Sequence, residues 1–457
     1  MDMKRVILVT VVLFFVTSCG NSGGIGGKGS RKGFEPPPEN MTIIPKGSFE
    51  MGSNDEDYVW AMNAPLRRRT TDDFFMDLTE TTNLSYREFV NWTADSIARR
   101  VLANEGLDGF FFEDDEEDPE PDPNDVRLNY RTAIHIRSPK QKSYEEHYPV
   151  LRDKEFFYSK QEALGQKRVI DTRKLYYKYK YFDLRQAAKA RWVVDENGVG
   201  HYEGKVMDKD GKSVDVQDRG SFMVEEDVPV YPDTLSWIRD FFNSYNEPLS
   251  RAYFWHPAYD YYPVVGVSWK QATAFCHWRS YHAKEKRYRN QYPAHEYRLP
   301  MEVEFEYAAR GGLEGNLYPW GSMYNTNSSG CFLANFKPQR GDYALDGFSR
   351  TSPVAQYEPN EFGLYDMAGN VSEWVNDTYD ENGYETTHDL VPVYHQHVFK
   401  GDKASKKRKV VRGGSWKDIS YFMQTGARNY DYMDSTHSYI GFRTVRDAVV
   451  GNRQPGR

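Results

Sequence analysis

The sequence predicts a large, loop-rich, water-soluble fold whose core is built from aromatic side chains. Aromatic residues make up 15% of the 457 residues and include 34 Tyr and 10 Trp, which can fill a bulky core. The mean hydropathy of −0.78 and the 35 Gly and 23 Pro residues favour loops at a wet surface. The formal net charge of −8 offers no basic surface for a nucleic acid, so we exclude nucleic acid as a partner.

The first 40 residues predict secretion, lipid attachment and a flexible tether. A basic pair precedes an apolar run over residues 6–16, which has signal-peptide proportions and is too short to cross a bilayer. Residues 16–19, Val-Thr-Ser-Cys, resemble a bacterial lipobox. We therefore expect a signal peptide over 1–18, an acylated Cys19 and a Gly- and Ser-rich tether over 19–40. An ordinary secretory signal with an incidental cysteine is the alternative.

The residues after Cys19 indicate the destination of the chain. Neither an acidic inner-membrane retention residue nor an acidic surface-export stretch follows this cysteine. We therefore expect a lipid-anchored protein of the outer membrane that faces the periplasm.

Several segments predict regular structure beyond the tether. A helix is expected over 86–102, a second helix should follow Trp269, and Pro300 can begin a third. On the third helix, Glu306 and Arg310 are one turn apart and can pair. Tight turns are expected at the Gly413-Gly414 pair, because no lysine of a phosphate-binding loop follows it.

The interval between residues 53 and 263 contains two charged segments with different predictions. The acidic run over 113–125 is interpreted as a solvated loop. The segment 168–192 is rich in Tyr, Lys and Arg, which favour interfaces, and is expected to be ordered. Its candidate partner-binding residues are Tyr176, Tyr177, Tyr179 and Arg185.

Opposite charge suggests one contact between subunits. The acidic run could steer toward the basic cluster formed by Lys403, Lys406, Lys407, Arg408 and Lys409. Two solvated loops without a mutual contact are the alternative.

Seven blocks in a fixed order carry a resemblance to a known family. They are residues 44–53, 263–278, 297–312 (YRLPMEVEFEYAARGG), 318–321, 360–374, 412–416 and 441–443. Together they resemble the sulfatase-modifying, formylglycine-generating-enzyme superfamily, whose fold is related to the C-type lectin fold. The resemblance implies an α+β, loop-rich domain over 41–447. Its discontinuous core would comprise about 41–100 and 255–447, with a large insertion over about 101–254 and a C-terminal tail at 448–457.

The same resemblance implies that oxidase chemistry is absent. The oxidases bind copper through two cysteines, and this chain has Asp418 and Met423 at those positions. Thiolates select Cu(I), whereas a carboxylate is a hard oxygen ligand and a thioether is neutral. No cysteine occurs over 332–457. We therefore expect a protein that is not an enzyme and holds no copper. A divergent sulfatase-modifying oxidase and a lectin-like ligand-binding lipoprotein are the alternatives.

The two remaining cysteines leave the question of a disulfide open. Cys276 and Cys331 could be bridged in the periplasm. In the oxidases the residue at Cys276 pairs with a cysteine just after Gly-Phe-Arg, where this chain has Thr444. Cys276 is therefore expected to be a buried helix residue.

The sequence contains candidate ligands for two kinds of metal site, a histidine site and a calcium site. His395 and His397 would lie on one face of a strand, but no third ligand accompanies them and a surface loop is the better explanation. Calcium with a structural role is implied by the resemblance, and all four side-chain positions hold oxygen donors. One site would use Asn335, the Phe336 carbonyl, Asp346 and the Phe348 carbonyl; a second would use Asp366, the Gly369 and Val371 carbonyls, and Glu373. Satisfying loop amides is the alternative role for these groups.

A closer resemblance comes from residues outside the seven blocks. Residues 80–83, 86–90, 95–99 and 171–188 resemble the PorK/GldK lipoproteins of the type IX secretion and gliding-motility machinery. The resemblance implies a structural ring subunit under the outer membrane, joined to a periplasmic PorN/GldN-like partner and to further copies of itself through head-to-tail contacts.

Overall fold

The computed structural model describes residues 36–53, 64–110, 128–134, 142–163, 169–195, 198, 200–207, 211–286, 296–396, 398–399 and 401–448. The predictions for the signal peptide, for Cys19, for the acidic run 113–125 and for His397 lie outside these residues. Among the described residues, no helix combines the length and the apolar character needed to cross a membrane.

Two four-stranded sheets form the framework of the body. The first has the order β1 (Met41–Ile44), β4 (Phe74–Asp77), β16 (Val445–Asp447), β11 (Tyr297–Arg298), and all its pairs are antiparallel. The second has the order β14 (Asn429–Tyr432), β13 (Arg408–Arg412), β12 (Ser372–Thr378), β15 (Ile440–Gly441), with one parallel pair, β12 and β15. A separate hairpin joins β2 (Gly47–Met51) to β3 (Arg67–Thr71). Strands distant in sequence are therefore neighbours in both sheets.

Three main helices pack on these sheets. They are α2 (Asn83–Asn104), α7 (Trp269–Lys286) and α8 (Glu302–Arg310). The helices expected over 86–102 and after Trp269 are confirmed. The prediction that Pro300 begins the third helix is wrong by two residues. The Glu304 carboxylate accepts a hydrogen bond from the Met301 amide, and this makes Met301 the N-cap of the helix. The shorter helices are α3 (Lys142–Asp153), α4 (Leu184–Ala187), α5 (Ser236–Asp240), α6 (Glu247–Ala252) and α9 (Gly383–Thr386).

The main core is a cluster of aromatic rings between α2 and α7. The Tyr86 and Phe275 rings are stacked with centroids 5.6 Å apart, and Phe442 approaches the Phe275 ring edgewise at 5.4 Å. All three side chains are buried. Such pairs add to the free energy of burial, so the aromatic-rich composition is used as expected.

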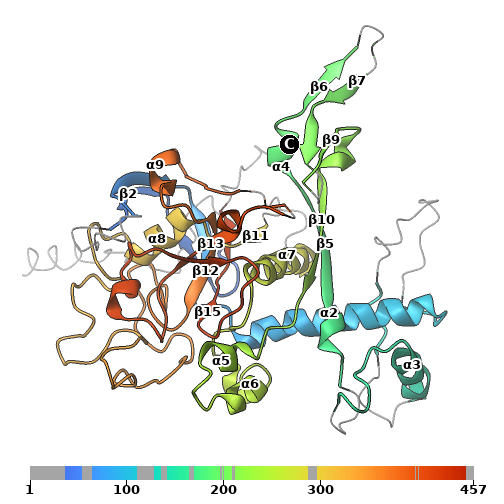
Figure 1. The fold of residues 1–457 in the computed structure, drawn as a ribbon, viewed down its shortest axis with the longest axis horizontal. Helices are drawn as coiled ribbons and strands as arrows, with labels where there is room; N and C mark the ends of the chain where they lie inside the picture. Colours follow the sequence, from blue (N-terminus) through green and yellow to red (C-terminus); the bar gives the residue numbers. More distant parts are fainter. Residues whose placement is uncertain are drawn as a thin grey trace, which may run out of the picture.

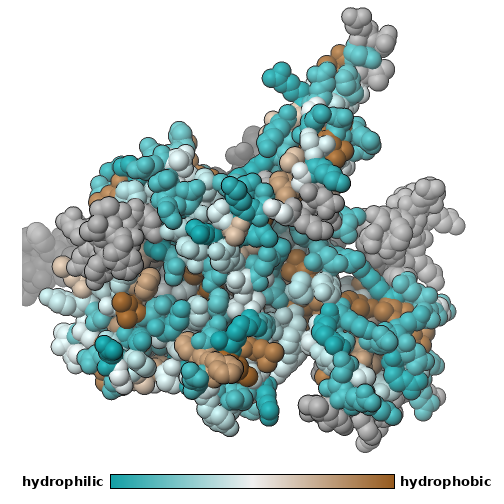
Figure 2. Space-filling model, in the orientation of Figure 1, coloured by the Kyte–Doolittle hydropathy of each residue, from teal (hydrophilic) through white to brown (hydrophobic). Residues whose placement is uncertain are grey.

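A two-stranded ribbon rises from this body as an arm (Figure 1). The arm comprises residues 171–230: β5 (Tyr176–Phe182) and β10 (Met223–Pro229) form its stem, and two short hairpins form its outer part. The hairpins are β6 (Arg191–Val194) with β7 (Gly200–Glu203), and β8 (Lys205–Met207) with β9 (Ser213–Asp215). Val206, Val216 and Phe222 form a small separate core there. Figure 2 shows a largely hydrophilic arm with a few apolar side chains exposed at its surface.

A histidine between two aspartates fastens α5 to the loop after β14. His437 Nδ1 lies 2.9 Å from Asp240 Oδ1, and its Nε2 lies 2.9 Å from Asp431 Oδ2. Burial by itself would lower the pKa of His437, but the hydrogen bonds to the two aspartates outweigh it and raise the pKa to about 9. The imidazolium form therefore stabilises the fold.

This arrangement predicts a pH-dependent stability. Because the folded pKa of His437 is raised, its contribution is complete below the unfolded value of about 6.5 and is lost as the pH rises through about 9. Wild type should lose up to about 3 kcal/mol of unfolding free energy over that range relative to His437→Gln. Urea denaturation at pH 6 and pH 9.5 measures this difference. The exposed His201→Gln is the control, and equal pH dependence in His437→Gln and wild type would contradict the assignment.

Candidate functional site

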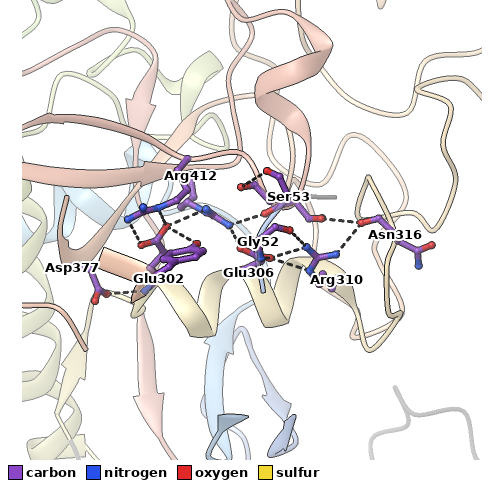
Figure 3. A network of polar contacts seen from close by, with 12 residues as sticks. Gly52, Ser53, Glu302, Glu306, Arg310, Asn316, Asp377 and Arg412 are labelled. Carbon is purple, nitrogen blue, oxygen red and sulfur yellow. Dashed lines mark hydrogen bonds and ion pairs between the residues drawn. The ribbon is translucent and has the colours of Figure 1, made fainter. Parts of the chain in front are cut away.

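A buried ion network, drawn in Figure 3, includes Arg412. Arg412 begins the loop over residues 412–423, which carries Asp418 and Met423. On α8, Glu306 is fully buried and accepts hydrogen bonds from the Arg310 and Arg412 guanidinium groups. The Gly52 amide donates to Glu306 Oε1 at 2.8 Å. Burial would raise the pKa of Glu306, but the two arginine charges outweigh it and lower the pKa. The expected pair of Glu306 and Arg310 is confirmed as part of a larger network.

Glu302 extends the network along the same helix. Its Oε1 accepts from Arg412 at 3.1 Å and from Arg428 at 2.6 Å, and the Tyr384 hydroxyl donates to it at 3.1 Å. The Glu302 amide in turn donates to Asp377 at 2.8 Å. With every member buried, each charge depends on its partners rather than on water.

Asp418 makes contacts within the loop, whereas Met423 packs against residues outside it. The Asp418 carboxylate accepts from the Ser415 hydroxyl at 2.5 Å, and its Oδ1 lies 3.9 Å from the Lys417 ammonium. Met423 is buried in an apolar cluster that includes Phe336. Asp418 therefore stabilises a turn and Met423 fills an apolar cluster, and the two do not form a shared pair of metal ligands.

Glycines close the same loop. Gly413 and Gly414 have φ values of +87° and +68°, so the tight turns expected there are confirmed. A Cβ at Gly414 would lie 2.7 Å from the Phe422 carbonyl oxygen. The two ends of the loop thus pack backbone to backbone, which only glycine allows.

An ion pair stands where the oxidases would have a disulfide. Cys276 is buried in α7, and burial raises the pKa of its thiol far above the ordinary value. Thr444 is also buried; its hydroxyl donates to Asp77 at 2.8 Å and accepts from Arg279 at 2.7 Å. Cys276 and the exposed Cys331 are both free. The expectation of a buried helix cysteine is confirmed, and the alternative of a bridge to Cys331 is wrong.

The first calcium set converges on one loop. Asp346 accepts from the Phe336 amide at 2.7 Å and from the Phe348 amide at 3.2 Å. Asn335 donates through its Nδ2 to the Arg350 carbonyl, while its buried Oδ1 has no hydrogen-bond partner. A buried oxygen without a hydrogen-bond partner is a donor of the kind that a hard cation binds. Asn335 therefore offers one unused oxygen, whereas both Asp346 oxygens already accept from backbone amides.

The second set fits less well. Both oxygens of Glu373 accept from the Arg443 guanidinium at 2.8 to 3.0 Å, and both side chains are buried. Asp366 Oδ2 accepts from the Ala355 amide at 2.6 Å. Since Arg443 already neutralises Glu373, this set lacks a second free carboxylate for a cation.

The described residues contain no group of three or more His, Cys, Asp or Glu side chains placed to hold a metal ion. His395 is partly buried, and its ring lies near the Lys409 ammonium, with 3.4 Å between Nδ1 and Nζ. The surroundings of His395 therefore include a basic group, the Lys409 ammonium.

Lys409 corrects the predicted basic surface cluster. Its side chain is buried, its ammonium lies 4.0 Å from the centroid of the Trp269 ring, and it donates to the Asn376 carbonyl at 3.0 Å. Burial lowers the pKa of Lys409 to about 7. Lys409 cannot be a surface steering charge because strand β13 is covered at this point, whereas Lys403 and Lys406 are exposed.

The candidate partner-binding residues are ordered in the arm, as expected, but they differ in exposure. Tyr177 packs edgewise on Phe89, and Tyr179 stacks on His277 with centroids 4.2 Å apart. Arg185 donates to the His395 carbonyl at 2.7 Å. Three of the four residues thus fasten the arm to the body, whereas Tyr176 is 42% exposed.

Sequence reasoning missed most of the network. The pair of Glu306 and Arg310 has helical spacing, but Arg412 and Arg428 come from more than 100 residues further along the chain. The unusual concentration of charge on α8, which is otherwise apolar, is the sequence feature that indicates such a network.

Comparison with known proteins identifies one family. The sulfatase-modifying factor enzyme 1-like domain matches residues 30–152 and 235–448. Residues 153–234, which include the arm, lie between the matched ranges.

Named relatives agree with this match. The inactive C-alpha-formylglycine-generating enzyme 2 of Bos taurus is 33% identical over 46% of this chain, and that of Mus musculus is 34% identical over 41%. The chain covers only 60% and 49% of these two relatives. The formylglycine-generating enzyme of Bos taurus is 27% identical over 92% of this chain and 78% of its own length. Among solved structures, PvdO from Pseudomonas aeruginosa aligns over 92% of this chain and 100% of its own, with 18% identity and a TM-score of 0.42.

The network predicts a large cost for removing its central carboxylate. Glu306→Ala should lose about 3–5 kcal/mol of unfolding free energy, because Arg310 and Arg412 would remain buried without their partner. Glu314→Ala, at an exposed position just after α8, is the matched control and should remain near wild type. Urea denaturation followed by circular dichroism measures both variants. A loss in Glu306→Ala no greater than that of the control would contradict the role assigned to the network.

Proposed function

We propose that this chain, which belongs to the sulfatase-modifying factor enzyme 1-like family, is a non-catalytic member of it and a structural ring subunit of the type IX secretion and gliding-motility machinery. The observation that carries the non-catalytic part is the state of Asp418 and Met423. The first is bonded to Ser415 and the second is buried among apolar side chains. Neither offers the thiolate that copper-dependent cysteine oxidation requires.

Relatives support this reading. Two of the proteins most similar to the chain are named inactive formylglycine-generating enzymes. The chain is thus similar to proteins named as inactive, and fold alone does not specify function.

The ring role rests on the resemblance to the PorK/GldK lipoproteins and on the segment that carries it. Residues 171–188 include β5, one of the two strands in the stem of the arm, and the arm lies outside the family match. A subunit of a ring needs two different surfaces that meet head to tail. An arm that projects from the body supplies a surface distinct from the rest of the domain, and Tyr176 is its exposed candidate contact. The partner would be a PorN/GldN-like periplasmic protein.

The lipid anchor completes the proposal. Acylated Cys19 would hold the chain at the periplasmic face of the outer membrane, and residues 19–40 would connect the anchor to the folded body.

Extraction from native membranes tests whether the proposed assembly exists. A tagged chain is extracted with mild detergent, separated by size and examined by mass spectrometry. We expect a megadalton complex that contains many copies of the chain and a second periplasmic protein. The matched variant Cys19→Ser should move the chain to the soluble fraction. A monomer that oxidises a cysteine peptide in the presence of copper would contradict the proposal.

Calcium in the first set is a second part of the proposal. Asn335, Asp346 and the Phe336 and Phe348 carbonyls would hold the ion, which would supply structural charge compensation in the loop.

Calcium should raise the thermal midpoint of the full-length chain. At a hundredfold excess over the dissociation constant, the gain is about 2.7 kcal/mol, equivalent to a shift of a few degrees. Asp346→Asn keeps an acceptor for the backbone amide but removes the charge, so the shift should disappear. Asp342→Asn, at an exposed position in the same loop, is the control and should keep it. An equal shift in Asp346→Asn and wild type, or no shift in wild type, would refute this site.

A further inference from the structure

A small cavity, which shares Asp366 with the second calcium set, has walls of two chemical kinds. Trp320 and Tyr357 contribute aromatic surface, and Leu364 and Met367 contribute aliphatic surface. The carboxylates of Glu358 and Asp366 also line it, and its lining includes no Lys, Arg or His. The cavity is therefore both aromatic and negatively charged.

The aromatic walls are held in place by their own contacts. The Trp320 ring stacks on Tyr318 with centroids 5.0 Å apart and planes inclined by 11°, and its Nε1 donates to the Tyr324 carbonyl at 2.7 Å. The Tyr357 hydroxyl donates to the Asp346 carbonyl at 3.3 Å. Rings fixed from outside the cavity need little ordering when a ligand arrives.

The Asp366 carboxylate is equally fixed. Its Oδ2 accepts from the Ala355 amide at 2.6 Å, and its backbone is held in the left-handed region with φ of +54°. The side chain is only 8% exposed although it lines the cavity. A largely buried carboxylate in this position favours a cationic ligand over a neutral one.

The size of the cavity restricts which ligands can bind. Its volume is about 20 Å³, which suits one water-sized group. An ammonium head meets this limit, whereas a planar guanidinium is larger. An ammonium near an aromatic face also gains cation–π attraction.

We propose that this cavity binds an alkylammonium group, as carried by a lysine side chain of a partner protein or by a free polyamine. The site does not depend on the ring role. It uses the lining side chains alone and requires no metal.

The test uses the full-length chain in detergent and ligand-observed saturation-transfer NMR. The probes are n-butylammonium and 1-butanol, which have similar length and differ in charge. Butylammonium should bind about tenfold more tightly than butanol. Asp366→Asn keeps the acceptor for Ala355 and tolerates the left-handed backbone, and it should weaken butylammonium binding about tenfold.

Matched controls separate the cavity from general surface effects. Trp320→Leu should weaken butylammonium binding, while Trp192→Leu, which removes an exposed tryptophan of the arm, should not. Asp342→Asn is the corresponding control for charge. Should Asp366→Asn fail to fold, Trp320→Leu and its control still decide the question.

Two further probes distinguish the source of the ammonium. Binding of N-acetyl-lysine N-methylamide in preference to spermidine would indicate a protein partner, and the reverse would indicate a free polyamine; either supports the site. Equal binding of butanol and butylammonium, no binding of any amine, or unchanged binding in both cavity variants would overturn it.

Discussion

The buried network around Glu306 and Arg412 is the constraint on which the rest of the body depends. Carboxylates on one short helix meet guanidinium groups from β13 and from the chain before β14, and the backbone after β2 joins them through Gly52. A charge buried without its partner costs several kcal/mol. The network therefore forces segments hundreds of residues apart into one arrangement, and it fixes the start of the 412–423 loop through Arg412.

With that loop fixed, the side chains on it take up structural roles. Asp418 closes a turn, Met423 fills an apolar cluster, and the Thr444 hydroxyl belongs to an ion pair between Asp77 and Arg279. Each position that an oxidase would give to a cysteine is committed to packing or hydrogen bonding here. These contacts support the proposal that the chain keeps the architecture of its family without redox chemistry.

The arm adds a different kind of surface to this body. Tyr177 and Tyr179 fix the stem of the arm by packing against α2 and α7. Arg185, in α4, donates a hydrogen bond to the His395 carbonyl. A firmly rooted stem suits the proposed contact between subunits at Tyr176, since little conformational entropy is lost when a fixed surface binds.

Local patterns in the sequence predicted local structure well. The helix over 86–102, the pair of Glu306 and Arg310, the turns at Gly413-Gly414 and the buried Cys276 all depend on neighbouring residues, and all are confirmed. Features that depend on tertiary contacts could not be predicted from the sequence. In the sequence, Lys409 is one more basic residue in a cluster. In the structure, it lies in the paired strand β13 and is buried against Trp269. The ordered blocks predicted the family because their order along the chain carries information that single motifs lack.

We propose that the chain acts as a repeated structural unit rather than as an enzyme. Complexes released from native membranes can be imaged by electron microscopy, with an antibody fragment against the tagged chain to mark each copy. Closed rings in which the label recurs at regular intervals are expected. Isolated single copies without a recurring neighbour, in preparations where the membrane complexes are otherwise intact, would contradict the proposal.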